Sequence, residues 1–351
     1  AQIGLLLSIP MLARAVSGPA LAIWADGFSL RRTPMVLMLL VSAAGYAAIG
    51  FTRGYLSWLA LWFVASSLIA AVTPLADVLT LRRANREGFN YGWPRGIGSA
   101  AYIAANVGVG ALLALTAAGV ALVWTAAAAL LAALAAAVVL PPEPVHESGE
   151  RMHRRDRWRG LGGLLRDKTF MLAVLSVGAI QAAHAFYYGF SALAWRRQGI
   201  SEAMVGLLWG FGVAVEIGFL WFMEGWRRRV GPERMLIIGG VAAVVRWSAL
   251  AFAPPLWLLF PLQALHTLSF AATFLAGLRL IEQLAPPQSA STAQALSSSM
   301  SGGLLIGLAT LASGALYDVA HAKGYLLMAA LAAAGLAGAM QLNQRSRLRV
   351  S

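Results

Sequence analysis

The chain is a succession of long apolar stretches separated by short polar loops. Eleven stretches are long enough to cross a bilayer, for which a helix needs about 20 mainly apolar residues. They cover residues 2–24, 34–51, 55–79, 95–117, 119–140, 169–194, 203–223, 235–252, 256–278, 290–316 and 325–343. A backbone in lipid must satisfy its hydrogen bonds within the element, so we predict that each stretch is a helix.

Composition agrees with this pattern and excludes other classes. The residue types AVILMFWYC make up 59% of the 351 residues, charged residues make up 12%, and the mean hydropathy is +0.71. Soluble domains carry about 25% charged residues, and disordered chains have low hydrophobicity. The absence of cysteine excludes disulfides and cysteine-ligated metal sites. The predicted fold class is therefore an all-α polytopic membrane protein.

The net charge of +13 reflects the orientation of the spans. Of 27 Lys and Arg residues, 20 lie in one set of alternate loops and in the C-terminal tail, and four lie in the opposite loops. Basic residues gather in cytoplasmic loops, so we expect the first set and the C-terminus to be cytoplasmic. The pattern favours a multi-pass protein of a bacterial-type inner membrane, and no nucleic-acid partner is expected.

Eleven spans with a cytoplasmic C-terminus place residue 1 outside the cell. The sequence begins Ala-Gln at the edge of an apolar stretch, without a signal-peptide pattern. We therefore expect one further helix before residue 1, which gives twelve spans; the alternative is an eleven-span protein. A charged linker at 141–168 separates an N-terminal half (1–140, with five of six spans) from a six-span C-terminal half (169–351). Transporters built of repeated halves bind substrate near the midplane between those halves.

One loop carries a recognisable motif. The sequence ADGFSLRR places Asp26 five and six residues before Arg31 and Arg32. This spacing resembles the loop signature of the major facilitator superfamily, which lies between its second and third helices and takes part in conformational change. The segment 74–99, PLADVLTLRRANREGFNYGWPRGIGS, is similar to the fourth-to-fifth helix region of lactose-permease-like proton symporters.

Four further segments resemble the 3-phenylpropionate permease branch of that superfamily. They are QAAHAFYYGFSALAWRRQG (181–199), GLLWGFGVAVEI (206–217), VVRWSAL (244–250) and LQALHTLSF (262–270). The resemblance implies the major facilitator fold with two six-helix halves, and a secondary transporter rather than an enzyme. It also implies that the proton is the coupling ion and that no other cofactor is needed.

Charged residues inside spans are candidates for function, because each costs several kcal/mol to insert and faces a cavity or a partner. Asp77 and Arg95 are equally distant from residue 86, in the polar turn between their helices, so an antiparallel hairpin places them at one height. The resemblance assigns substrate binding to this pair. The alternative is a structural ion pair that fixes the hairpin.

Polar stripes on three spans add candidates for substrate binding. Tyr102 and Asn106 follow Arg95 at +7 and +11, which places them on one helical face, although Asn106 could instead serve helix packing. His184 and Tyr188 share a face of the sixth span, where the histidine could contact substrate, relay protons or only bond to another helix. Gln263 and His266 form a third stripe on the ninth span.

Glu216 lies near the middle of the seventh span and is the predicted proton-coupling acid, together with Asp77 and with Arg246 of the next span. The competing interpretation makes Glu216 a direct partner of Arg246. The embedded residues Arg14, Arg95, Arg246, Asp77 and Glu216 sum to +1, which favours an anionic ligand.

Together with these features, the resemblance implies proton-coupled symport of a small aromatic carboxylate, such as 3-phenylpropionate, by alternating access. The alternatives are a proton symporter of a neutral sugar or nucleoside and, behind it, a drug exporter. A membrane enzyme is disfavoured because the five histidines are scattered and no HExxH metal motif occurs. A receptor without transport would be distinguished by the lack of solute flux. We expect the protein to act as a monomer in the lipid bilayer.

Overall fold

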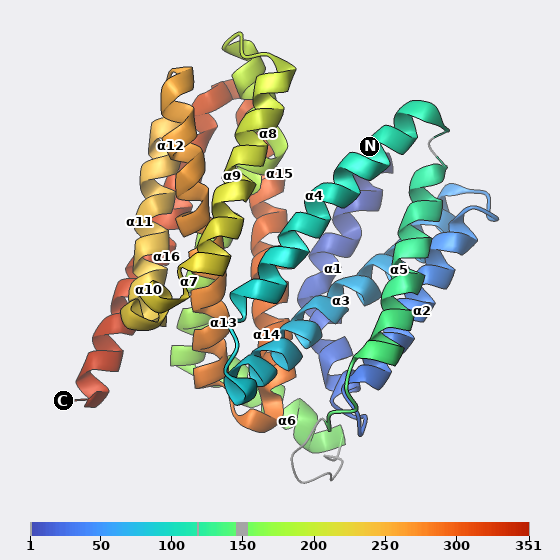
Figure 1. The fold of residues 1–351 in the computed structure, drawn as a ribbon. Coiled ribbons are helices and arrows are strands. Elements are labelled where there is room, and N and C mark those ends of the chain that lie inside the picture. Colours follow the sequence, from blue (N-terminus) through green and yellow to red (C-terminus); the bar gives the residue numbers. More distant parts are fainter. Residues whose placement is uncertain (1, 118, 145–153, 351) are drawn as a thin grey trace. The chain divides into compact units, whose positions relative to one another are not determined.

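The computed structural model describes residues 2–117, 119–144 and 154–350, and within these residues the chain is helical (Figure 1). The only extended pairing there is a single antiparallel bridge between Leu30 and Pro144. The N-terminal helices are α1 (Gln2–Ala25), α2 (Arg32–Ile49), α3 (Tyr55–Glu87), α4 (Gly92–Leu115), α5 (Val120–Val139) and α6 (Arg154–Arg166). The predicted all-α fold is confirmed.

The C-terminal part contains broken as well as continuous helices. Its α-helices are α7 (Lys168–Ala182), α8 (Ala185–Arg197), α9 (Glu202–Phe222), α10 (Glu224–Val230), α11 (Pro232–Leu250), α12 (Leu256–His266), α13 (Thr273–Leu284), α14 (Ala290–Ser299), α15 (Ile306–Ala320) and α16 (Tyr325–Val350). Two π-helical segments, η1 (Thr267–Ala272) and η3 (Met300–Leu305), join α12 to α13 and α14 to α15. The 3₁₀ turns η2 (Pro287–Ser289) and η4 (His321–Gly324) precede α14 and α16.

Each of the eleven predicted stretches is helical. Seven segments of the described residues are long and apolar enough to cross a membrane by length and composition. They are Arg32–Ile49, Tyr55–Glu87, Val120–Val139, Lys168–Arg197, Ala203–Phe222, Leu256–Leu284 and Pro287–Arg345, and the last contains two predicted stretches. The remaining stretches correspond to α1, α4 and α11.

Local chemistry sets several helix ends. The side chain of Asp167 accepts hydrogen bonds from the backbone N of Thr169 (2.8 Å) and Phe170 (3.0 Å), which caps α7. Ser201 caps α9 in the same way. Gly88 ends α3 in the left-handed region (φ +76°), where a residue without Cβ is favoured.

The chain forms two compact units that interleave in sequence. Unit 1 comprises Ala1–Phe89, Ala100–Leu164 and Pro286–Ser299, and unit 2 comprises Asn90–Ser99, Leu165–Ala285 and Met300–Ser351. Two spans therefore supply residues to both units: α4 begins in unit 2, and α14 lies in unit 1 while α15 lies in unit 2. The division into functional halves at the 141–168 linker stays a prediction.

Small residues allow close helix packing in unit 2. α16 lies beside α11 and α7 (Figure 1). A Cβ added to Gly240 of α11 would lie 3.1 Å from the Leu336 side chain of α16, and one added to Gly338 of α16 would lie 2.1 Å from the Ser176 Oγ of α7. Such contacts are typical of membrane helix interfaces, where small side chains let backbones approach. The core of unit 1 includes Ala25, Met35, Met38, Ala71 and Leu75.

Candidate functional site

The centre of the candidate site is Arg246 on α11, whose side chain is fully buried (0% exposed) in unit 2. Its Nη1 bonds to Nδ1 of His266 (3.0 Å), and its Nη2 donates to Oε1 of Gln263 (2.7 Å). The guanidinium lies 4.4 Å from the ring centroids of both Tyr187 and Trp247. Within the described residues, its hydrogen bonds end on neutral groups and no carboxylate forms an ion pair with it. This is a buried positive charge held by neutral acceptors and ring faces.

Among the described residues, His266 lies between Glu216 on α9 and Arg246. The Oγ of Ser99 donates to Oε1 of Glu216 (3.0 Å), while Oε2 lies 3.8 Å from Nε2 of His266. Arg246 has only N–H donors to offer, so Nδ1 of His266 must accept, and the proton of the neutral ring lies on Nε2, the atom nearest Glu216. The His266 ring therefore lies between the two residues proposed from sequence as direct partners, bonded to Arg246 and 3.8 Å from Glu216.

Aromatic rings surround this polar chain, which we call the Arg246 cluster (Tyr187, Glu216, Arg246, Gln263 and His266). Trp209 of α9 stacks on Tyr187, with centroids 4.4 Å apart and planes at 24°. Tyr188 of α8 is 42% exposed and lies 6.1 Å from the Trp209 ring. The cluster is thus buried at Arg246, while Tyr188 on its aromatic side is partly exposed.

His184 lies at the break between α7 and α8 and is fully buried. Its Nδ1 lies 3.2 Å from the Ile180 carbonyl oxygen and 3.0 Å from that of Gln181, so Nδ1 donates. Its Nε2 then accepts from the Ser269 hydroxyl of η1 (3.2 Å). The backbone N of His184 bonds to Gln181 instead of Ile180, and the ring satisfies the Ile180 carbonyl in its place. Both ring nitrogens of His184 are therefore already hydrogen-bonded, Nδ1 to the carbonyls at the helix break and Nε2 to the Ser269 hydroxyl of η1.

The first turns of α4 belong to unit 2 and bring Arg95 to the same site. The Arg95 guanidinium lies 4.7 Å from the Phe274 ring centroid, and its charge attracts the Glu216 carboxylate. Ser99, one helical turn after Arg95, supplies the hydroxyl that binds Glu216. Ser99 is not among the residues predicted from the sequence, although its spacing of +4 from Arg95 could have indicated it.

A second feature missed from sequence is the buried Arg227 of α10. Its Nη2 donates to Oδ1 of Asn90 (2.9 Å), and its Nη1 donates to the carbonyls of Leu220 (3.0 Å) and Phe219. These carbonyls end α9, where a cation is favoured. Burial lowers the pKa of this guanidinium. In the sequence Arg227 is one of three consecutive arginines, and no pattern separates it from its exposed neighbour Arg228.

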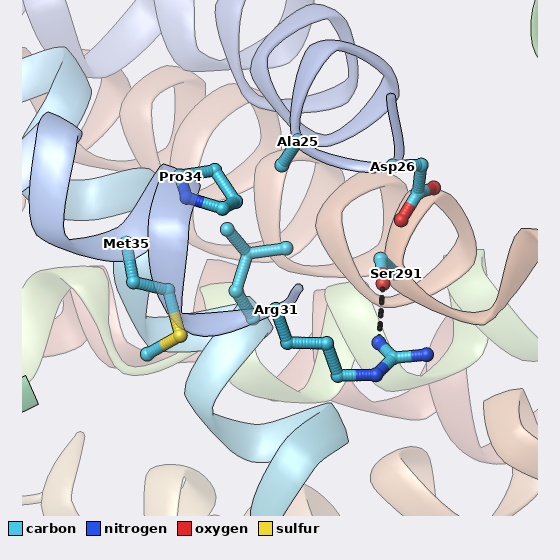
Figure 2. A pocket seen from close by; sticks show the side chains of 7 residues that line it. Ala25, Asp26, Arg31, Pro34, Met35 and Ser291 are labelled. Atoms are coloured by element: carbon cyan, nitrogen blue, oxygen red, sulfur yellow. Dashed lines mark hydrogen bonds between the residues drawn. The ribbon is translucent and has the colours of Figure 1, made fainter. Parts of the chain in front are cut away.

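The loop motif binds the first turn of α14 within unit 1. Thr292 donates to Oδ2 of Asp26 (3.1 Å), and Nη1 of Arg31 donates to the Ser291 hydroxyl (3.3 Å). Figure 2 shows the Arg31 side chain extended toward Ser291 along one side of a small pocket that Asp26 also lines. Arg32 donates to the Leu140 carbonyl at the end of α5 (3.4 Å). The motif thus ties the α1–α2 loop to α14 and α5.

Comparison with known proteins identifies the family. The model of the MFS_1 like family matches residues 1–327. The chain belongs to this family. It is therefore a multi-pass membrane transporter of small molecules and not an enzyme, as the sequence predicted.

Curated relatives of this MFS_1-like transporter cover most of its length. It is 28% identical over 346 residues to the probable 3-phenylpropionic acid transporter of Escherichia coli, a match that covers 94% of this chain and 86% of that protein. It is also 28% identical over 325 residues to the maltose permease of Geobacillus stearothermophilus, covering 91% and 79%. The predicted resemblance to the 3-phenylpropionate permease branch is confirmed.

Solved structures share the fold of this transporter. The human organic anion transporter TETRAN matches with a TM-score of 0.76 at 16% identity, covering 97% of this chain and 83% of that one. The fucose:proton symporter of Escherichia coli matches with a TM-score of 0.73 at 17% identity, covering 97% and 90%. The predicted major facilitator fold is confirmed.

The remaining predicted site residues of the transporter lie in unit 1. Asp77 is half-buried on α3, and Tyr102 of α4 is 70% exposed. The side chain of Asn106 lies outside the described residues. The pairing of Asp77 with Arg95, which belongs to unit 2, stays a prediction, as do the binding roles of Tyr102 and Asn106.

Proposed function

We propose that the protein is a proton-coupled symporter of a small aromatic carboxylate such as 3-phenylpropionate. The observation that carries the proposal is Arg246, a fully buried cation without a carboxylate partner among the described residues. A guanidinium binds carboxylates with charge-assisted, often bidentate hydrogen bonds. The name of the 3-phenylpropionic acid transporter agrees with this substrate class.

Glu216 is the proposed proton carrier. A carboxyl group at membrane depth is a candidate for proton relay, and Glu216 is 5% exposed. His266 cannot take this role while Arg246 donates to its Nδ1, because a second ring proton would face that donor. Proton binding at Glu216 and anion binding near Arg246 would then be linked through His266, with Asp77 as a further coupling acid.

The proposed substrate contacts are Arg246 and Tyr187 of the cluster, together with Asp77, Arg95, Tyr102, Asn106, Tyr188 and His266. His184 and Gln263 make so many hydrogen bonds within the protein that we propose them as supports of the site rather than ligands. The distribution of basic residues supports a cytoplasmic C-terminus in a bacterial inner membrane. We propose a monomer driven by the proton alone.

The test is substrate-driven proton movement in proteoliposomes that contain a lumenal pH indicator. External 3-phenylpropionate should acidify the lumen faster than it acidifies protein-free vesicles, which report passive diffusion of the acid. Arg95→Gln should abolish uptake and leave the thermal unfolding profile unchanged. Acidification no faster than in protein-free vesicles would contradict proton coupling, and full uptake by Arg95→Gln would remove Arg95 from the site.

A neutral sugar is the second candidate, because the maltose permease is 28% identical to this chain. Competition separates the two substrate classes. Excess unlabelled 3-phenylpropionate should displace radiolabelled 3-phenylpropionate, whereas maltose or a nucleoside should not. Displacement by maltose alone would assign the protein to the sugar transporters.

A further inference from the structure

The amide of Gln263 on α12 has an unambiguous orientation. Its oxygen faces Nη2 of Arg246 (2.7 Å), which only donates, and its nitrogen faces the Leu208 carbonyl oxygen (3.0 Å), which only accepts. The second amide hydrogen points to the hydroxyl of Tyr187 (2.8 Å). Gln263 is 1% exposed, and its donors are both used. Gln263 therefore orients the Arg246 and Tyr187 side chains and has no donor left for a ligand.

This orientation fixes the polarity of Tyr187. Because the hydroxyl oxygen accepts from Gln263, its own hydrogen must point away from the amide. Among the described residues no acceptor takes that hydrogen. A phenolic hydroxyl has one O–H donor and an oxygen that accepts, and here the oxygen already accepts from Gln263 while the O–H is unused. Toward an incoming group, the Tyr187 hydroxyl is set as a donor.

Two further donors in and beside the cluster lack acceptors among the described residues. They are the Nε of Arg246 and the Nε1 of Trp247, whose ring lies against the Arg246 guanidinium, and both are buried. Buried unsatisfied donors are costly, so a group that brings acceptors would be stabilised beside them. With Tyr187 they form a group of unpaired donors around Arg246, and Gln263 uses its only acceptor on Arg246. The carboxylate of Glu216 lies beyond His266, with its Oε2 3.8 Å from the His266 Nε2.

We propose that Gln263 is a specificity-determining residue, which holds Tyr187 and Arg246 as donors and so selects a carboxylate over its neutral amide. A carboxylate brings only acceptors, which pair with these donors. A primary amide brings two N–H donors, one of which would face a donor and stay unpaired. This inference rests on the proposed function, because it concerns the same site and an organic anion as substrate.

The test compares binding of 3-phenylpropionate and 3-phenylpropionamide to the purified protein by isothermal titration calorimetry. Wild type should bind the carboxylate about 10- to 100-fold more tightly than the amide, the range expected for one hydrogen bond to a charged group. Gln263→Glu places a carboxylate against Arg246 and Tyr187, so it should remove this preference and favour the amide. Gln283→Glu, at an exposed position of α13, adds the same charge and should keep the wild-type ratio.

A spectroscopic readout separates this inference from the proposed function. The tyrosine Fermi doublet in ultraviolet resonance Raman spectra, taken as wild type minus Tyr187→Phe, reports whether the phenol oxygen accepts a hydrogen bond. It should indicate an acceptor in wild type and lose that signature in Gln263→Leu. Absence of carboxylate binding to wild type, with the Raman signature intact, would overturn the proposed function alone. An unchanged ligand ratio in Gln263→Glu, or an unchanged doublet in Gln263→Leu, would overturn the role of Gln263.

Discussion

At the scale of single residues, the chemistry of this transporter depends on how a buried cation is held. Arg246 contacts a histidine, an amide and two ring faces instead of a carboxylate. Burying a charge without an opposite charge costs several kcal/mol, which hydrogen bonds and cation–π contacts offset in part. The positive charge of Arg246 that these contacts do not neutralise can attract an anion. The planar shape of the guanidinium matters as well, because its two terminal nitrogens donate separately, Nη1 to His266 and Nη2 to Gln263.

Arg246→Lys keeps the positive charge but removes the planar guanidinium with its two separated donor nitrogens. A lysine ammonium is a point charge that does not reproduce two separated planar donors, so we expect uptake of 3-phenylpropionate to fall about 10- to 100-fold, the loss of one charge-assisted hydrogen bond. Initial uptake rates in proteoliposomes measure the effect. Arg228→Lys, at a residue that pairs with Glu224 on the exposed face of α10, is the control and should transport normally. Wild-type rates in Arg246→Lys would show that charge alone suffices.

At the scale of elements, breaks and close contacts place the site residues. The break between α7 and α8 is stabilised by the His184 ring, which bonds the Ile180 carbonyl and the Ser269 hydroxyl of η1. The start of α4 packs on the end of α9, where Trp93 stacks on Trp221 with centroids 5.0 Å apart. This packing holds the turn that carries Arg95 and Ser99 beside Glu216.

Gly92 permits this contact. A Cβ at Gly92 would lie 2.0 Å from the Leu220 carbonyl oxygen, a backbone atom that is not free to rotate away. Gly92→Ala should therefore lower the free energy of unfolding by about 1–3 kcal/mol, the usual cost of overpacking. The midpoint of thermal unfolding of the purified protein measures this change.

Gly98→Ala is the matched control on the same helix. The nearest atom to its added Cβ is the Arg95 Nη1 at 4.0 Å, and alanine favours helix by up to about 1 kcal/mol over glycine. Its unfolding midpoint should equal or exceed that of wild type. Equal midpoints for the two variants would contradict the close contact between α4 and α9.

At the scale of the whole molecule, two spans link the compact units. α4 contributes its first turns to unit 2 and the rest to unit 1, and the helix from α14 to α15 divides near Ser299. In unit 1, α14 is held to the α1–α2 loop through Asp26 and Arg31. If transport proceeds by alternating access between the two predicted halves, we expect the contact between α1 of the N-terminal half and α14 of the C-terminal half to open in each cycle.

A cross-link between α1 and α14 tests this requirement. A Cβ at Gly18 would lie 3.2 Å from the Ser299 Cβ, near the separation that a disulfide needs. The protein has no cysteine, so the double variant Gly18→Cys/Ser299→Cys carries the only two thiols. Oxidation should block uptake of 3-phenylpropionate and a reductant should restore it, while the single variants should not respond. Full uptake by the cross-linked protein would contradict opening of this contact.

The sequence by itself determined the helices, the fold family and the residues whose charges lie inside the spans. Hydropathy and the distribution of basic residues are properties of each segment, so they need no knowledge of its neighbours. The candidates Glu216, Arg246, His266 and Gln263 were predicted because polar residues are conspicuous in apolar helices. All four lie together in unit 2.

Only the tertiary structure decided how those residues connect. Periodicity gives the face of a helix but not which helix lies against it, so it did not show that His266 stands between Glu216 and Arg246. It also did not reveal the break at His184, because a hydropathy plot does not register where a ring replaces a backbone N–H. The direction of each hydrogen bond, on which the role of Gln263 rests, exists only once the donors and acceptors of three helices have met.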